Sequence, residues 1–205
     1  GYEDFFLVIL ILHAVQIGTI FTLGPSLVLD TQRRRDWVHY TLPYLMAKGT
    51  VAMGLEWIAL SISMAGSMAC LGLTVRGGWL SLAFLMTAYL AAIIAFGLCM
   101  GSWVEKPERA ITYALFYIMP SVLFAGAIWP RYSMDSVSLF LSYIIPAGYA
   151  VEDVRSLLVQ GVAPYWLLHA GILIVYTIVF MGLSCVGLSR KKRRYTSCGT
   201  VCREK

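Results

Sequence analysis

Residues 79–104 read WLSLAFLMTAYLAAIIAFGLCMGSWV, and no charged side chain interrupts them. A helix needs about 20 consecutive apolar residues to cross the roughly 30 Å hydrocarbon core of a membrane, so we predict a transmembrane helix here. The whole chain of 205 residues is 59% hydrophobic and only 13% charged, whereas soluble domains carry about 25% charged residues. This composition excludes a soluble enzyme, a nucleic-acid-binding module and a disordered chain.

Four further apolar runs lie on either side of this stretch and predict four more spans. Residues 5–29 and 164–189 carry no charge, and residues 49–72 carry only Glu56. Residues 110–130 are also uncharged, although a proline in their middle should kink the helix. The predicted fold is therefore all-α: a polytopic membrane protein with five transmembrane helices in a single domain, 1–189, followed by a basic tail, 190–205.

The basic residues indicate which way these spans point. Of the 16 Lys and Arg, three fall on one side of the predicted membrane, namely Arg76, Arg131 and Arg155, and the other thirteen share the opposite side. Cytoplasmic loops are enriched in Lys and Arg, so we expect the N-terminus of this chain outside and its C-terminus in the cytoplasm. An odd number of spans that starts outside is unusual, and we expect one further span ahead of Gly1.

Motifs for nucleotide binding or catalysis are missing from the sequence. No Lys is preceded by Gly and followed by Ser or Thr, which excludes the usual phosphate-binding loop. There is also no His-Glu-x-x-His and no Gly-x-Ser-x-Gly. Cys198 and Cys202 lie four residues apart in the tail but lack two further zinc ligands nearby. We therefore expect no enzyme activity, metal or cofactor in this chain, and the alternative is a membrane-embedded enzyme acting on lipid or lipid-linked substrates.

Three ionisable side chains lie within predicted spans: Glu56, His13 and His169. Such residues are functional candidates, because a charged group in lipid is costly. Glu56 could pair with a basic residue, line a polar path or lie at the interface as a structural group. Each His could relay protons or simply pack with a hydrogen bond. Gly97 and Gly101 form a Gly-x-x-x-Gly step, a spacing that lets helix backbones approach closely in lipid.

The segment 131–163 is apolar in patches but too broken to cross a membrane. Ser133 and Asp135 are candidate N-caps for a first helix, 136–145, which Pro146-Ala147-Gly148 should end. A second, amphipathic helix is predicted over 149–160. Ten apolar residues cannot span, so the first helix should dip into the outer leaflet and return. The pair would then be re-entrant or interfacial, and a plain external loop is the alternative.

Several motifs around this segment, taken in order, resemble the end of type-2 ATP-binding-cassette (ABC) transporter permeases. They read FAGAIWPRYSM at 124–134 and YIIPAGYAV at 143–151, followed by an Arg and a closing Gly161. That family typically shows a Ser-Gly-x-x-x-Pro stretch, a Met-Pro, a second Pro before an aromatic residue, an Arg and a Gly. Here Ala125 replaces the Ser and Asp135 replaces the Pro after Met. The resemblance covers nearly the whole chain and leaves the subfamily open.

The resemblance implies the membrane subunit of an ABC exporter that lacks its N-terminal span, in the plasma membrane (the bacterial inner membrane). Two permease chains, identical or different, would form the path among membrane lipids, and two separate ATP-binding subunits with ATP and Mg would dock underneath. No nucleic acid is implied. A drug, lipid, glycan or peptide could each be the cargo.

The same resemblance implies roles for two groups of residues. A cytoplasmic loop would couple to the ATP-binding subunit. The alternative is that its basic residues only hold the loop on the cytoplasmic side of the membrane. The loop residues are Arg33, Arg34, Arg35, Asp36, Trp37 and Tyr40. The re-entrant segment would form an outer gate: Pro130, Met134, Pro146, Gly148, Tyr149, Arg155 and Gly161.

Overall fold

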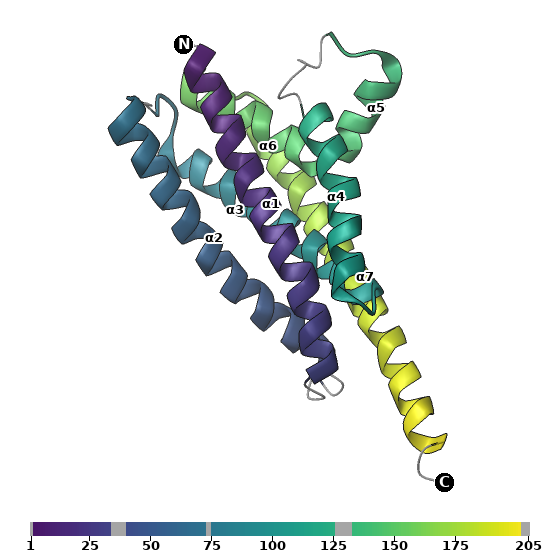
Figure 1. Ribbon diagram of the computed structural model, residues 1–205. Coiled ribbons are helices and arrows are strands. Elements are labelled where there is room, and N and C mark those ends of the chain that lie inside the picture. Colours follow the sequence, from purple (N-terminus) through teal and green to yellow (C-terminus); the bar gives the residue numbers. More distant parts are fainter. Residues whose placement is uncertain (1, 34–39, 73–74, 126–132, 202–205) are drawn as a thin grey trace.

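The computed structural model describes residues 2–33, 40–72, 75–125 and 133–201, and within these ranges it contains helices and no strands. The helices form an elongated bundle in which α7 extends beyond the others toward the C-terminus (Figure 1). Their bounds are α1 Tyr2–Arg33, α2 Thr41–Leu71, α3 Trp79–Trp103, α4 Pro107–Phe124, α5 Ser136–Ile144, α6 Pro146–Arg155 and α7 Trp166–Val201, with a π-helical turn at Ser156–Gln160. The predicted all-α class is confirmed.

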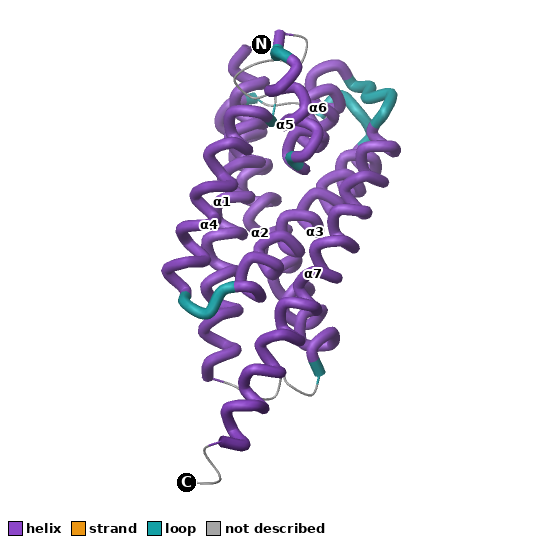
Figure 2. Tube along the Cα trace, turned by 90° about the vertical axis from the view of Figure 1, so that its right-hand side faces the viewer, coloured by secondary structure: helices purple, strands orange, loops and turns teal. Residues whose placement is uncertain are grey.

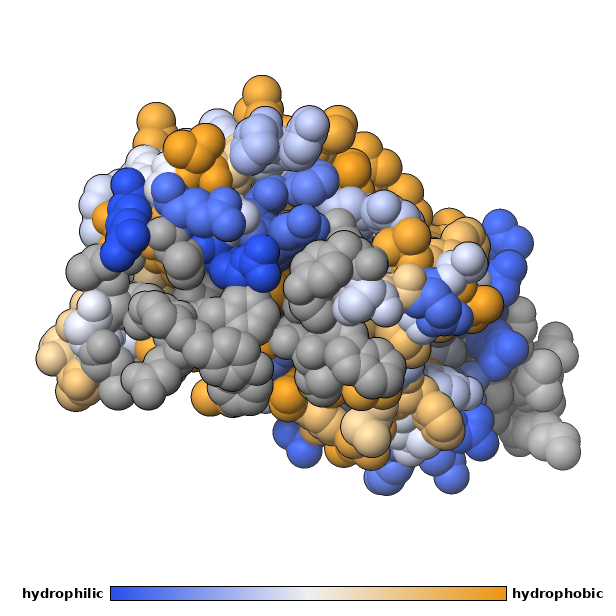
Figure 3. Space-filling view, turned by 90° about the horizontal axis from the view of Figure 1, so that it is seen from above, coloured by the Kyte–Doolittle hydropathy of each residue, from blue (hydrophilic) through white to orange (hydrophobic). Residues whose placement is uncertain are grey.

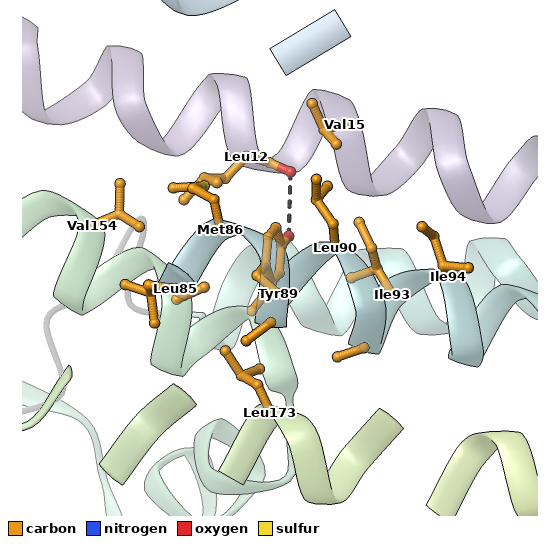
Figure 4. Close-up of a cluster of buried hydrophobic side chains, with 14 of the residues drawn as sticks. Leu12, Val15, Leu85, Met86, Tyr89, Leu90, Ile93, Ile94, Val154 and Leu173 are labelled. Atoms are coloured by element: carbon orange, nitrogen blue, oxygen red, sulfur yellow. Dashed lines mark hydrogen bonds between the residues drawn. The ribbon is translucent and has the colours of Figure 1, made fainter. Parts of the chain in front are cut away.

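Helix α3 lies at the centre of the bundle and packs against both α1 and α7. Its sequence is apolar on every face, and its central position buries most of its residues from Leu82 to Ser102, while both ends of the helix stay exposed. Tyr89 is fully buried among apolar side chains from α1, α3, α6 and α7 (Figure 4). Its hydroxyl donates to the carbonyl of Leu12 on α1 at 3.3 Å, so this buried polar atom is satisfied.

Small residues bring α3 into backbone contact with α1, as the Gly-x-x-x-Gly step predicts. A Cβ at Gly101 would lie 2.5 Å from the carbonyl oxygen of Gly24, and a Cβ at Gly97 would lie 3.3 Å from the Cβ of Leu23. A similar approach joins α3 to α7, where a Cβ at Gly187 would lie 2.5 Å from the Ser102 hydroxyl. The three helices therefore cross with no room for side chains between them.

Four described helices are long and apolar enough to cross a membrane: α1, α2, α3 and α7. Helix α1 is longer than predicted at both ends, α2 begins eight residues earlier, α3 matches its prediction within one residue, and α7 continues without a break through the basic cluster into the predicted tail. The predicted span at 110–130 is not among them. Helix α4 begins earlier, at Pro107, and ends at Phe124; its 18 residues reach about 27 Å, but Glu108 and Arg109 at its start make it less apolar than the four spans. Residues 126–130 of that predicted span lie outside the described ranges.

The predicted helix pair of the broken segment is present, and its two members are bent by 91° (Figure 2). Asp135 caps α5 as predicted, since its carboxylate accepts from the Ser138 amide at 3.4 Å. The predicted position of the break is wrong. Ile145 alone separates the helices, and α6 begins at Pro146, because the fixed φ of Pro suits the first helical position. Gly148 lies inside α6 without a positive φ.

Candidate functional site

The helix pair, α5 and α6, lies at the end of the bundle where α1 begins (Figure 1). Its bend leaves the last carbonyls of α5 without helical partners. The Tyr176 hydroxyl of α7 donates to the carbonyl of Ile144 at 2.8 Å and lies 3.1 Å from that of Tyr143. The Tyr149 hydroxyl of α6 also donates to the Tyr143 carbonyl, at 2.9 Å. One tyrosine of α6 and one of α7 thus hold the end of α5 in place.

A buried polar pair makes a second link between the helix pair and α7. His169 Nδ1 lies 2.7 Å from a carboxylate oxygen of Asp153, and Asp153 is 4% exposed. The ring of Tyr149 lies beside the same His, with centroids 5.2 Å apart. His169, treated from the sequence as an isolated residue, therefore has a carboxylate partner. No sequence signal identifies Asp153, because the two residues lie on separate helices whose packing brings them together.

The π-helical turn after α6 is packed against the short connection between α2 and α3. Gly161 ends the turn with φ +81°, as its predicted closing role requires. The Gly77 amide donates to the Leu157 carbonyl at 2.8 Å, and a Cβ at Gly77 would lie 2.7 Å from that oxygen. This contact holds the end of α6 to the start of α3.

The remaining predicted gate residues are distributed around this region. Pro146 and Gly148 are buried in the first turn of α6, and Tyr149 is buried beside them. Met134 and Arg155 are half-buried. Pro130 lies outside the described residues. Seen from this end, hydrophilic side chains form a connected patch with hydrophobic residues beside it (Figure 3).

A cluster of polar side chains lies in the middle of the bundle and joins four helices. The Gln16 amide nitrogen on α1 donates to the Ser121 hydroxyl of α4 at 2.9 Å. The amide oxygen of Gln16 lies 3.2 Å from the Tyr89 hydroxyl of α3, which shares its hydrogen between this oxygen and the Leu12 carbonyl. The Thr19 hydroxyl lies 2.6 Å from Glu56 of α2. Gln16 was not a predicted site residue, although an amide within an apolar run is the signal that identifies it.

His13 lies on α1 close to this cluster and remains a packing residue in the structure. Its Nδ1 lies 2.9 Å from the carbonyl of Ile9 in the preceding turn. Its Nε2 is buried and has no hydrogen-bond partner in the described part of the chain. Within the described residues, the contact with Ile9 is thus the one hydrogen bond of this ring.

At the opposite end of the bundle, polar contacts tie the helices together. Lys48 lies 2.6 Å from a carboxylate oxygen of Asp30, and Arg194 lies 2.6 Å from Glu105. Lys191 is buried, and its ammonium group donates to the Gly101 carbonyl at 2.9 Å. The basic cluster of α7 thus contacts α3 in addition to any anionic lipid.

The predicted coupling loop connects α1 to α2 at this end. Arg33 is the last residue of α1, and Tyr40 precedes α2 with 69% of its surface exposed. Arg34, Arg35, Asp36 and Trp37 lie outside the described residues. Among the residues that are described, no group of three or more His, Cys, Asp or Glu could hold a metal ion.

Comparison with known proteins identifies the family. The profile of the ABC-2 type transporter family matches residues 5–159, which include α1 to α6. The chain belongs to the ABC-2 type transporter family. This membership indicates a membrane-embedded transport subunit rather than a catalytic enzyme, and it confirms the resemblance to type-2 ABC permeases.

Individual relatives carry permease names. The chain is 30% identical over 139 residues to the "Probable multidrug ABC transporter permease YbhS" of Escherichia coli K12, an alignment that covers 67% of this chain and 37% of YbhS. It is 25% identical over 152 residues to "Nodulation protein J" of Rhizobium meliloti, covering 70% of this chain and 57% of that protein. The chain therefore spans well under two thirds of the length of these relatives.

Proposed function

We propose that this chain is the permease subunit of an ABC exporter, which moves its cargo outward with ATP hydrolysed on a separate subunit. The observation that carries this proposal is the helix pair fixed to α7 in a chain of the ABC-2 family. Such a pair would close the outer end of a path without crossing the membrane. The asymmetry of basic residues supports this orientation, with α5 and α6 outside and the C-terminus in the cytoplasm of a bacterial cell.

Coupling to the ATP-binding subunit would occur at the connection between α1 and α2. Both helices run the length of the bundle, so a displacement at residues 34–39 would move their shared end directly. The exposed ring of Tyr40 supports a protein contact here. ATP and Mg would be held by the partner, since this sequence lacks a phosphate-binding loop.

A second permease chain would complete the path. Helix α4 supports this proposal, because it is shorter than the spans and presents large apolar side chains on its exposed face: Ile111, Leu115, Phe116, Met119 and Leu123. The exposed apolar side chains of α7, and those of α2 that point away from α1, would face lipid. Whether the second chain is identical or different does not affect this arrangement.

The proposal is tested by replacing Trp37 in the coupling loop. Trp37→Ala should lower recovery of a co-expressed ATP-binding subunit and abolish most of the cargo-stimulated ATP hydrolysis in reconstituted membranes. Buried interface aromatics are typically worth about 1–4 kcal/mol, which predicts a several-fold or larger loss of binding.

A matched control is Trp79→Ala, which removes a 60% exposed Trp from the opposite end of the bundle. This variant should retain both subunit recovery and hydrolysis. If Trp37→Ala instead binds the ATP-binding subunit and stimulates hydrolysis like the parent chain, the loop is only a charge anchor. If no ATP-binding subunit is recovered with the parent chain, the proposed function itself is wrong.

A further inference from the structure

An open cavity of about 480 Å³ lies between α1 and α2, and we call it the α1–α2 groove. Its walls combine aliphatic side chains with polar ones, among them Leu23, Val51 and Leu55 beside Thr22 and Ser26. Three charged residues also line it: Asp30, Lys48 and Glu56. A volume of this size falls within the roughly 300–1,000 Å³ range of small-molecule sites.

The charges of the α1–α2 groove do not balance. Asp30 and Lys48 form an ion pair at 2.6 Å near the end of the groove where α1 and α2 are connected. Among the described residues that line the groove, Lys48 is the only cationic one. After this pairing, the carboxylate of Glu56 is left over, so the groove has an uncompensated negative charge when Glu56 is ionised.

Glu56 occupies an unusual position for a carboxylate. It lies 15 residues from either end of α2 (Thr41–Leu71), about 22 Å along the helix axis, and therefore near the middle of a predicted span. One of its oxygens lies 2.6 Å from the Thr19 hydroxyl, whose single hydrogen is shared with the Val15 carbonyl at 2.7 Å. Within the described residues it has no other hydrogen bond and no ion-pair partner. A carboxylate at this depth is stabilised when a cation approaches it.

We propose that the α1–α2 groove binds an amphipathic organic cation, with Glu56 as the counter-charge and Thr19 as the residue that orients it. Leu23, Val51 and Leu55 would contact the apolar body of the ligand. This inference rests on the proposed function, because it assigns the cargo, or one class of cargo, to cationic amphipaths. The sequence alone is compatible with several kinds of cargo, and this inference favours cationic amphipaths over anionic lipids and neutral glycans.

Tetraphenylphosphonium and tetraphenylborate provide the test, because the two ions have nearly the same size and apolar surface but opposite charge. The permease, in complex with its ATP-binding subunit, is placed in nanodiscs of zwitterionic phosphatidylcholine, and binding to empty nanodiscs is subtracted. The parent complex should bind tetraphenylphosphonium at least tenfold more tightly than tetraphenylborate. Glu56→Gln should weaken tetraphenylphosphonium binding about tenfold and leave tetraphenylborate binding unchanged.

Two further variants keep the result interpretable. Glu108→Gln removes the same charge from an exposed position on α4 and should change neither affinity. Lys48→Met removes the cation of the groove and should strengthen tetraphenylphosphonium binding several-fold, which no general loss of folding would produce.

Equal affinities of the parent for the two ions, or unchanged tetraphenylphosphonium binding by Glu56→Gln, would overturn the inference. An apolar segment of a second permease chain that fills the groove would give this same negative result, and cross-linking from Val51→Cys would identify it. A different result would contradict the proposed function: the complex with the ATP-binding subunit does not form, or no compound stimulates its ATP hydrolysis.

Discussion

The α1–α3 crossing and helix α5 are held in place by different physical means. At the crossing, Gly24 and Gly101 place two backbones in direct contact, so dispersion over a continuous surface stabilises the arrangement. Helix α6 is buried in the same apolar core, whereas Ser142 is the one buried residue of α5, and the end of α5 is fixed by the hydroxyls of Tyr149 and Tyr176. A close-packed crossing resists displacement, whereas a segment held by a few hydrogen bonds can be released when they break. This difference is what an outer gate requires: the α1–α3 crossing stays in place while α5 moves.

The largest effect is expected at the crossing itself. Gly101→Ala would place a Cβ 2.5 Å from the Gly24 carbonyl oxygen, and a backbone atom cannot move aside as a flexible side chain can. Overpacking of this kind typically costs about 1–3 kcal/mol. We expect a marked fall in the melting temperature of the purified protein in detergent and in its abundance in membranes.

The control for this change is Gly54→Ala on α2, where an added Cβ meets no atom within 4 Å. That variant should keep the parental melting temperature or exceed it, since Ala favours a helix over Gly by about 1 kcal/mol. Equal melting temperatures for Gly101→Ala and the parent would show that the crossing is not the rigid part of the molecule.

The second effect concerns the buried link between α6 and α7. Asp153→Ala leaves His169 without its carboxylate partner, and an unsatisfied buried polar group costs about 1–3 kcal/mol. We expect hydrogen exchange in α6 to accelerate by one or more orders of magnitude while exchange in α3 stays near the parental rate. Acceleration in both helices to the same extent would mean that the helix pair and the core unfold together.

A smaller effect is expected from the tyrosine that holds the bend. Tyr176→Phe removes the hydroxyl that donates to the Ile144 carbonyl at 2.8 Å and keeps the ring, so about 0.5–1.5 kcal/mol should be lost. Transport should change more than abundance does, measured as cargo efflux per copy of protein. Tyr113→Phe on α4, at a half-exposed position outside the five residues proposed to contact a second chain, is the matched control. Identical efflux in the two variants would argue against a gating role for the bend.

The smallest effect is a pH dependence at the start of α5. Hydrogen bonds from Ser138 hold the pKa of Asp135 below its ordinary value of 3.8. A lowered carboxyl pKa contributes stability above pH 3.8, and that stability is lost as the pH falls through the folded-state pKa. The amide of Ser138 should therefore lose protection at acid pH, after correction for intrinsic exchange, and Asp135→Asn should remove this dependence. A pH profile shared by both proteins would exclude Asp135 as its source.

Much of the fold follows from local sequence patterns. The apolar runs located α1, α2, α3 and α7, because a span needs a minimum length of apolar chain whatever its neighbours are. Asp135 and Gly161 were predicted as helix boundaries because capping depends on a few adjacent residues. Where local signals compete, the prediction is wrong. Pro146 and Gly148 were read together as the end of a helix, whereas Pro146 starts α6 and Gly148 continues it.

The candidate sites were predicted much less well than the helices. Glu56 and His169 were identified as unusual residues in lipid, but their partners Thr19 and Asp153 were not. Both partners are ordinary in their own helices and become notable only beside the other residue. The coupling residues from Arg34 to Trp37 lie outside the described residues, so their role stays a prediction.

The sequence by itself determined that this protein is a helical membrane protein, which of its segments are long enough to span, and where the chain is broken before its last helix. These properties depend on hydrophobic length, charge and short-range capping, all of which are local. Only the tertiary structure decided that α3 is central, that Tyr176 fixes the bend of the helix pair, and that Glu56 faces the α1–α2 groove. These properties depend on which helix faces touch, and contacts between residues far apart in the chain leave no signal in either residue alone.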